Sequence, residues 1–109
     1  MMNIKAGEFW IAELQYTNGT AAKKRPVLIL WLDGRDAIVA VVTSAQPRTN
    51  TDVLLEQWAE SGLRVASTVR LSRIDCLEQS LLTKKIGQLD EIDAKQLKKV
   101  WQESIGLQF

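Results

Sequence analysis

The sequence predicts a mainly β protein with one C-terminal helix, arranged as a small curved sheet or a partly open barrel that the helix closes. Two apolar runs, at residues 27–32 and 38–42, flank a turn signal at 33–35 and indicate a pair of buried strands. A longer stretch, 65–77, alternates in side-chain character, which is typical of a strand. After residue 90, apolar residues recur at helical spacing, so the last element is expected to be a helix.

The first half of the chain is expected to hold four short strands. Pro26 restricts Arg25 to an extended conformation and has no amide donor for a ladder, so this pair belongs at a strand start. The near-continuous apolarity of strands two and three implies burial on both faces or a tightly curved sheet. The expected strands are 9–14, 27–32, 38–42 and 52–55, and the polar loops between them are 15–24, with an Asn-Gly turn signal, and 44–51.

The second half is expected to hold a helical turn, two strands and the helix. Residues 56–63 form the turn, which ends at a glycine because glycine accepts a left-handed conformation. A long strand at 65–77, with room for a bend, and another at 81–87 follow. Asp90 is expected to cap the helix by accepting a hydrogen bond from the amide of Asp93 or of its predecessor. The expected apolar face of the helix consists of Ile92, Leu97, Val100, Trp101 and Ile105, opposite Lys95, Lys98 and Lys99.

Composition and charge are those of an ordinary soluble protein. The chain has 109 residues and a net charge of +1, with 46% apolar and 25% charged residues, which allows one domain over 1–109 with a modest core. No apolar run approaches the roughly 18 residues that a membrane span needs. The first residues lack the apolar stretch of a signal peptide, so a cytoplasmic location is expected.

Two absences from the sequence exclude large classes of chemistry. There is no histidine, and so no histidine acid, base or metal ligand. Cys76 is the single cysteine, which excludes an intrachain disulfide and a cysteine zinc cluster. No metal or cofactor is therefore expected. Cys76 has apolar neighbours and is itself expected in the core.

The ends of strands two and three carry the best candidates for chemistry. Arg25 lies at the start of one strand, and Thr43 and Ser44 lie at the end of the next. If these strands pair as a hairpin, Arg25 and Thr43 lie near the same end of the sheet, where a guanidinium beside a hydroxyl suits a phosphate. Lys23 and Lys24 extend this pair into a basic patch. A strand-end hydroxyl can instead cap the following loop, and that alternative stays open for Thr43.

An ordered set of short segments resembles one protein family. The set is similar to the MazF/PemK family of toxin endoribonucleases, and its second half resembles PemK-like members. The resemblance covers about residues 6–107. The segments that carry it are Gly7-Glu8-Phe9-Trp10, Lys24-Arg25-Pro26-Val27-Leu28-Ile29, Val42-Thr43-Ser44, Trp58 to Leu63, Ser67-Thr68-Val69-Arg70 and Lys85-Ile86-Gly87-Gln88-Leu89.

The resemblance implies an SH3-like barrel of the MazF/PemK/CcdB toxin type and a homodimer. It implies metal-independent cleavage of single-stranded mRNA, in which the ribose 2′-hydroxyl attacks the adjacent phosphorus, and a cognate antitoxin protein as partner. By this resemblance Arg25 is the catalytic arginine and Thr43 its paired hydroxyl. The residues expected to bind RNA are Lys23, Lys24, Ser44, Arg48, Arg70, Ser72 and Arg73.

Two departures from the family pattern keep other functions open. Arg70 matches an arginine that PemK-like members place two residues before a carboxylate, but that second position is Ser72 here. Residues 20–22 are Thr-Ala-Ala, where relatives carry acidic or histidine side chains. The alternatives are a degenerate member that binds RNA or a protein without turnover, and a CcdB-like gyrase poison. An exposed apolar surface at Trp101 and Phe109 would favour the gyrase poison.

Glu8 and the tryptophans are expected to be mainly structural. Glu8 can act as an acid, but a solvated strand position is favoured. Trp31 and Trp101 lie in an apolar strand and on the apolar helix face, which favours packing over base stacking. Trp10 and Trp58 are expected at a rim or a dimer surface.

Overall fold

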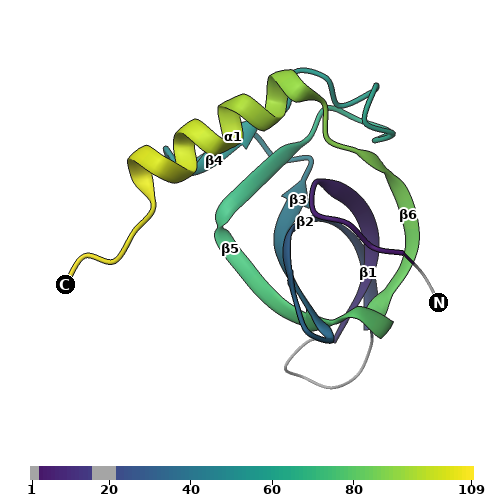
Figure 1. Cartoon of the computed structure of the whole chain (residues 1–109). Helices are drawn as coiled ribbons and strands as arrows, with labels where there is room; N and C mark the ends of the chain where they lie inside the picture. Colours follow the sequence, from purple (N-terminus) through teal and green to yellow (C-terminus); the bar gives the residue numbers. More distant parts are fainter. Residues whose placement is uncertain (1–2, 16–21) are drawn as a thin grey trace.

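The computed structural model describes residues 3–15 and 22–109 and contains a curled antiparallel sheet with one helix laid along its outside (Figure 1). Strand boundaries follow the predicted ones closely, except that β2 begins earlier and β5 begins later than expected. The elements are β1 (Glu8–Gln15), β2 (Ala22–Asp33), β3 (Asp36–Thr43), β4 (Asp52–Leu54), β5 (Thr68–Glu78), a 3-10 turn (Gln79–Leu81), β6 (Leu82–Gln88) and α1 (Glu91–Ser104).

The sheet forms the partly open barrel that the sequence predicts. Its strand order is β4-β5-β3-β2-β1-β6, with every neighbouring pair antiparallel. Figure 1 shows the strands curling into a ring in which β6 approaches β5 from the other side. Within the described residues no ladder joins β6 to β4, so the sheet curls without closing.

Both faces of the sheet are buried, which explains why strands two and three are apolar almost without interruption. Alternate side chains of a strand point to opposite faces. Val27 and Ile29 therefore enter a core inside the barrel, whereas Leu28 between them enters a core under α1. The inner core consists of Ile4, Trp10, Ala12, Val27, Ile29, Ala37, Val39, Leu77 and Leu82. The outer core consists of Phe9, Leu28, Ala40, Val42, Val53, Leu55, Leu63, Val69, Leu71 and Leu97.

Strand β5 bends sharply, as the sequence allows. Ala40 of β3 pairs with Ile74, but the next β3 residue, Val41, pairs with Arg70. Residues 71–73 therefore form a bulge with no register partner on β3. Bulges bend a strand and increase its twist, and Figure 1 shows the bend in β5 that lets the sheet turn around the inner core. The regular alternation predicted across 65–77 is wrong beyond this point.

The start of α1 is anchored by two carboxylates. Asp90 accepts a hydrogen bond from the amide of Ile92 at 3.0 Å, which confirms the predicted cap. Asp93 is 1% exposed and accepts hydrogen bonds from the amides of Glu56 and Gln57 at 2.8 and 2.9 Å. The predicted apolar face is wrong at Ile92, which is 52% exposed, because the helix turns Asp93 inward instead. The predicted helical turn within 56–63 is confirmed: the Ser61 amide donates to Gln57 O at 3.1 Å, and the turn ends at Gly62, whose φ of +92° is left-handed.

Three expectations about single residues are wrong because of bulges and strand alternation. Cys76 is exposed on the outside of β5 rather than in the core. Desolvation and then the Asp36 carboxylate raise the pKa of its thiol, which makes it a poor nucleophile. Trp10 is 4% exposed and lies in the inner core rather than at a rim. Trp31 is 45% exposed because a register shift after Ile29 turns it outward.

Glu8 is buried in a hydrogen-bonded network, which corrects the prediction of a solvated strand residue. Its side chain is 6% exposed. It accepts hydrogen bonds from the Lys5 amide at 2.8 Å and Trp10 Nε1 at 3.0 Å, and it pairs with Lys85 Nζ at 2.8 Å. Burial acts to raise the pKa of Glu8, but the hydrogen bonds from Lys85, Trp10 and Lys5 outweigh it and lower that pKa below its usual value.

We expect Glu8→Gln to lower the free energy of unfolding at pH 7 by about 1–3 kcal/mol, since a charged acceptor of buried donors is lost. A carboxyl with a lowered pKa in the folded state stabilises the protein above its unfolded pKa of about 4.3 and loses that effect as pH falls through the folded value. Chemical denaturation should therefore give a difference between wild type and variant that shrinks below about pH 4. Glu60→Gln, at an exposed position, is the control. Equal stabilities at pH 7 would contradict this account.

Candidate functional site

Arg25 and Thr43 lie at the same end of the predicted hairpin. The ladder between β2 and β3 runs from Asp33↔Asp36 to Val27↔Val41. Arg25 and Thr43 are each two residues beyond Val27 and Val41, so the same register sets them opposite one another. Arg25 also pairs with Ala12 of β1, and Thr43 pairs with Thr68 of β5, so strand pairing fixes the backbone at both positions.

Strand alternation adds three further residues to the same face. Thr68 lies opposite Thr43, and Arg70 is two residues further along β5, so their side chains share a face. Asp52 of β4 pairs directly with Arg70. Neighbouring strands are roughly 4.8 Å apart, so a single bound chain can reach across this set. We call Arg25, Thr43, Asp52, Thr68 and Arg70 the polar face.

Two threonine hydroxyls lie side by side on the polar face. Thr43 Oγ1 accepts a hydrogen bond from the amide of Ala45 at 3.2 Å, which is the loop cap that the sequence left open. Its hydroxyl hydrogen can still be donated to a ligand. Thr68 is fully buried, and its Oγ1 has no hydrogen-bond partner within the described part of the chain. Buried hydroxyls are normally bonded, so the polar face has donor capacity beyond its internal contacts.

A carboxylate and a guanidinium form an ion pair at the edge of the polar face. Arg70 Nε donates to Asp52 Oδ1 at 3.3 Å, and the Arg48 amide donates to Asp52 Oδ2 at 2.9 Å. Sequence reasoning missed Asp52 and Thr68. Both were placed in predicted strands, but only the pairing of β4 with β5 and of β5 with β3 shows which side chains they adjoin.

The other predicted site residues surround the polar face without all facing it. Lys23 and Arg25 share a side of β2, and alternation places Lys24 on the opposite side, so the three do not form one patch. Ser44 and Arg48 lie in the exposed loop between β3 and β4. Ser72 and Arg73 lie exposed in the β5 bulge, where the regular register is lost. Lys23, Lys24 and Arg25 are all exposed at the start of β2.

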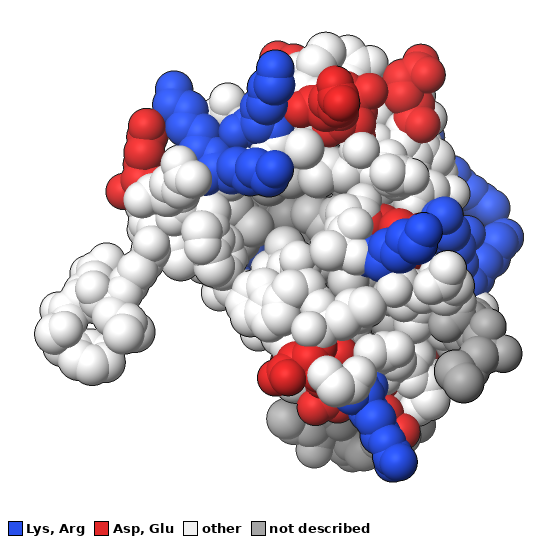
Figure 2. Space-filling model, in the orientation of Figure 1, with Lys and Arg blue, Asp and Glu red and all other residues white. Residues whose placement is uncertain are grey.

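A second surface feature lies away from the polar face. A groove of about 520 Å³ runs between α1 and the outer wall of the barrel, with apolar side chains from β2 and the helix as its main lining. Trp31 and Trp101 meet there edge to face, with ring centroids 6.1 Å apart. Figure 2 shows Lys and Arg side chains gathered over α1 and a hollow below the helix. Lys98 of α1 contributes to the groove lining.

Within residues 3–15 and 22–109, no group of three or more acidic, cysteine or histidine side chains is arranged to hold a metal ion. The one α-helix found there, α1, is too short and too polar to cross a membrane.

The family of PemK-like, MazF-like toxins of type II toxin–antitoxin systems matches residues 5–105. The chain belongs to this family. The match includes every residue of the polar face and the whole of α1, so the family resemblance expected from the short segments is confirmed. No curated protein matches the chain.

Solved structures of MazF-like toxins share the fold of this PemK/MazF-like chain. An endoribonuclease from mycobacterial species has a TM-score of 0.75 at 17% identity, with 100% of this chain and 97% of the other covered. A second structure, an endoribonuclease in complex with its cognate antitoxin from mycobacterial species, has a TM-score of 0.77 at 17% identity, with 98% and 99% covered. The Mycobacterium tuberculosis toxin MazF-mt6 has a TM-score of 0.69 at 26% identity, with 85% and 90% covered.

The fold prediction for this PemK/MazF-like toxin is thereby confirmed. The matched structures share the arrangement of sheet and helix over nearly the whole chain, and the sheet of this chain stays open.

Proposed function

We propose that this toxin is an endoribonuclease that cleaves single-stranded RNA, with Arg25 and Thr43 at the reacting phosphate. The observation that carries the proposal is the β2–β3 register, which, continued two residues past its last pair, Val27↔Val41, brings Arg25 and Thr43 to the same end of the sheet. Endoribonucleases among the structures that share the fold support it. The nucleophile is the ribose 2′-hydroxyl of the substrate, so the chain needs no nucleophilic side chain of its own.

The proposed reaction is a transesterification within the RNA. The ribose 2′-oxygen attacks the adjacent phosphorus and the 5′-oxygen of the next nucleotide leaves, which gives a 2′,3′-cyclic phosphate and a 5′-hydroxyl. The 2′-hydroxyl loses a proton and the leaving oxygen gains one. Arg25 stabilises the negative charge on the phosphorane, because its fork can donate to two phosphate oxygens. Thr43 donates to a phosphate oxygen or orients Arg25.

Partners and location follow from family membership as further parts of the proposal. The chain acts as one toxin domain over 1–109 and forms a homodimer in the cytoplasm. A cognate antitoxin protein binds and neutralises it; a mycobacterial endoribonuclease of the same fold was solved in complex with its cognate antitoxin. Polar and basic residues near the polar face contact the RNA backbone outside the reacting phosphate: Lys23, Ser44, Arg48 and Arg73.

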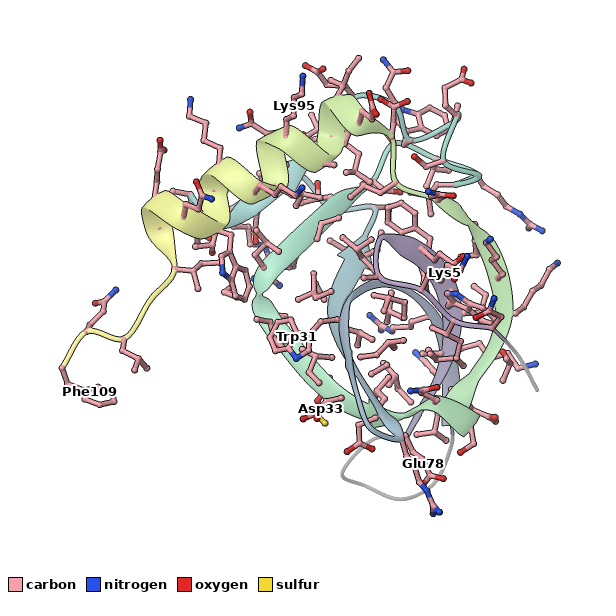
Figure 3. The ribbon with its side chains drawn as sticks, in the orientation of Figure 1. Lys5, Trp31, Asp33, Glu78, Lys95 and Phe109 are labelled. Atoms are coloured by element: carbon pink, nitrogen blue, oxygen red, sulfur yellow. The ribbon has the colours of Figure 1, made fainter. Side chains whose placement is uncertain are left out.

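One observation favours a second candidate, a poison that acts by binding a protein target. The sequence analysis tied that candidate to exposed apolar residues at Trp101 and Phe109. Phe109 is fully exposed and points away from the body of the molecule (Figure 3), whereas Trp101 is partly buried against Trp31. The apolar groove beside α1 adds to that surface. RNA cleavage by the purified chain decides between the two candidates.

We expect purified protein to cleave a long single-stranded RNA in excess EDTA at the same rate as in magnesium. The reason is that the sequence offers neither histidines nor a cysteine cluster, while Arg25 and Thr43 suit metal-independent transesterification. Product ends should be 2′,3′-cyclic phosphate and 5′-hydroxyl, which phosphatase and kinase treatment of labelled fragments can identify. Activity that disappears in EDTA and returns with magnesium would contradict the proposal. Intact RNA under all conditions would favour the binding poison.

A further inference from the structure

Asp52 is a buried carboxylate at the edge of the polar face. Its side chain is only 1% exposed, although it follows an exposed polar loop. Removing an ionised carboxylate from water is costly unless cations and hydrogen bonds compensate it. Asp52 has both, since Oδ1 pairs with Arg70 Nε at 3.3 Å and Oδ2 accepts from the Arg48 amide at 2.9 Å.

The way Asp52 holds Arg70 decides what the guanidinium can do. Contact is through Nε, at the side of the guanidinium, and not through the two terminal amino groups. A guanidinium has five N–H donors in a fixed plane, four of them on those terminal groups. Among the described residues, Asp52 is the acceptor found for Arg70. The Arg70 side chain is 22% exposed, so it is partly open to solvent although Asp52 holds its Nε.

The position of Arg70 places its free end beside the proposed reaction site. Arg70 lies opposite Val41 of β3, two residues from the pairing of Thr43 with Thr68. Two residues along a strand correspond to roughly 7 Å. An RNA strand whose scissile phosphate sits at Arg25 and Thr43 therefore passes a neighbouring phosphate close to Arg70. Arginine forks bind phosphate oxygens in a bidentate way when they are held in a fixed plane.

We propose that Asp52 is a positioning residue that holds Arg70 through Nε so that its terminal amino groups bind a phosphate adjacent to the scissile one. This inference rests on the proposed function. It makes the preferred substrate an RNA long enough to supply that second phosphate. The same carboxylate fixes the backbone of Arg48, so one side chain orders both Arg70 and the end of the 44–51 loop.

Removing Asp52 gives opposite results under this proposal and under simple charge repulsion. If Asp52 only repels the RNA backbone, Asp52→Asn strengthens RNA binding. If Asp52 positions Arg70, the same change weakens binding, because the NH₂ group of asparagine replaces one of the two acceptor oxygens and then faces either Arg70 Nε or the Arg48 amide, both of which are donors. We expect KM for a single-stranded RNA oligonucleotide to rise about tenfold, with kcat nearly unchanged, since the contacted phosphate does not react.

The experiment compares four purified full-length variants with wild type: Asp52→Asn, Arg70→Ala, the double variant and Asp75→Asn. Asp75 is an exposed carboxylate on β5, the strand that carries Arg70, and serves as the matched control. Its KM is expected to stay within about twofold of wild type. The double variant should be no worse than Arg70→Ala, because Asp52 acts through Arg70. Thermal melts accompany each assay. A KM for Asp52→Asn that is unchanged or lower, with an intact melt, overturns the proposal.

Arg70→Lys keeps the proposal testable if Asp52→Asn does not fold. A lysine preserves the ion pair with Asp52 but has a single nitrogen, so it cannot also bind a phosphate in a fork. We expect KM for Arg70→Lys to match that of Arg70→Ala; a wild-type KM overturns the proposal. Fluorescence anisotropy with the same oligonucleotide separates the two levels of inference. If wild type binds the oligonucleotide but does not cleave it, only the proposed function is overturned. The role of Asp52 is then tested by comparing the Kd of Asp52→Asn for the oligonucleotide with that of wild type. Wild type that does neither overturns both.

Discussion

Replacing Arg25 with alanine is expected to lower kcat for RNA cleavage by about 10²–10³-fold, the cost of removing one preorganised donor from a developing oxyanion. Arg25 is exposed at the start of β2 and contributes no apolar surface to either core, so the thermal melt should stay close to that of wild type. Arg25→Lys should restore little activity, because lysine keeps the charge but loses the fork that spans two phosphate oxygens. Initial rates on a labelled single-stranded RNA, with melts of the same samples, measure both effects.

Lys24→Ala is the matched control for this substitution. It removes the same charge from the adjacent residue, but strand alternation turns Lys24 to the opposite side of β2, so a small loss is expected. Thr43→Val should cost less than Arg25→Ala, since it removes one hydrogen bond to a charged group, worth up to about 3 kcal/mol. Wild-type cleavage by Arg25→Ala with an unchanged melt would move the search for the reacting site to Arg70 and Arg73.

Replacing Gly87 with alanine is expected to destabilise the fold strongly. A Cβ at Gly87 would overlap the carbonyl oxygen of Ser61, and the carbonyl carbon behind it would lie 2.7 Å away. Ser61 is 1% exposed and is hydrogen-bonded to Gln57 O through both its amide and its hydroxyl, so it cannot move aside cheaply. Overpacking against fixed backbone costs about 3 kcal/mol or more.

Thermal unfolding measures this effect directly. A loss of about 3 kcal/mol in a protein of this size corresponds to a decrease in Tm of roughly 12–24 °C. Gly106→Ala is the control, because nothing lies within 4 Å of a Cβ at Gly106. A Tm for Gly87→Ala within about 2 °C of wild type would contradict this account. It would show that the backbone at Ser61 can move away from β6 despite its hydrogen bonds to Gln57.

Local patterns were sufficient for much of the fold. The two apolar runs and the turn between them fix the β2–β3 hairpin, and the hairpin brings Arg25 and Thr43 to one end. The Asp90 cap needs only the sequence of the helix start. These features depend on residues close together in the chain, so alternation and capping rules find them.

Features that depend on distant residues were not accessible in this way. Glu8 is buried because it meets Lys85, and Asp93 is buried because it meets the amides of Glu56 and Gln57. No periodicity in the sequence reveals these partners. The bulge at 71–73 and the shift after Ile29 reset which side chains face inward, which explains the errors at Cys76 and Trp31.

The site residues also divide into those that nearby residues reveal and those that depend on distant partners. Arg25 and Thr43 were found from their own strand ends. Asp52 stayed hidden, because its role depends on a cross-strand pairing with Arg70 over 18 residues of sequence.

A sheet that separates two cores leaves little freedom for sequence change in its centre. Successive residues of β2 and β3 enter alternate cores, so a polar substitution there has no exposed side to occupy. Substitutions are therefore expected to be tolerated mainly at strand ends, in the 44–51 loop and in the β5 bulge, which are also the places that surround the polar face. Changes at these places can alter the polar face while the wall between the two cores stays the same.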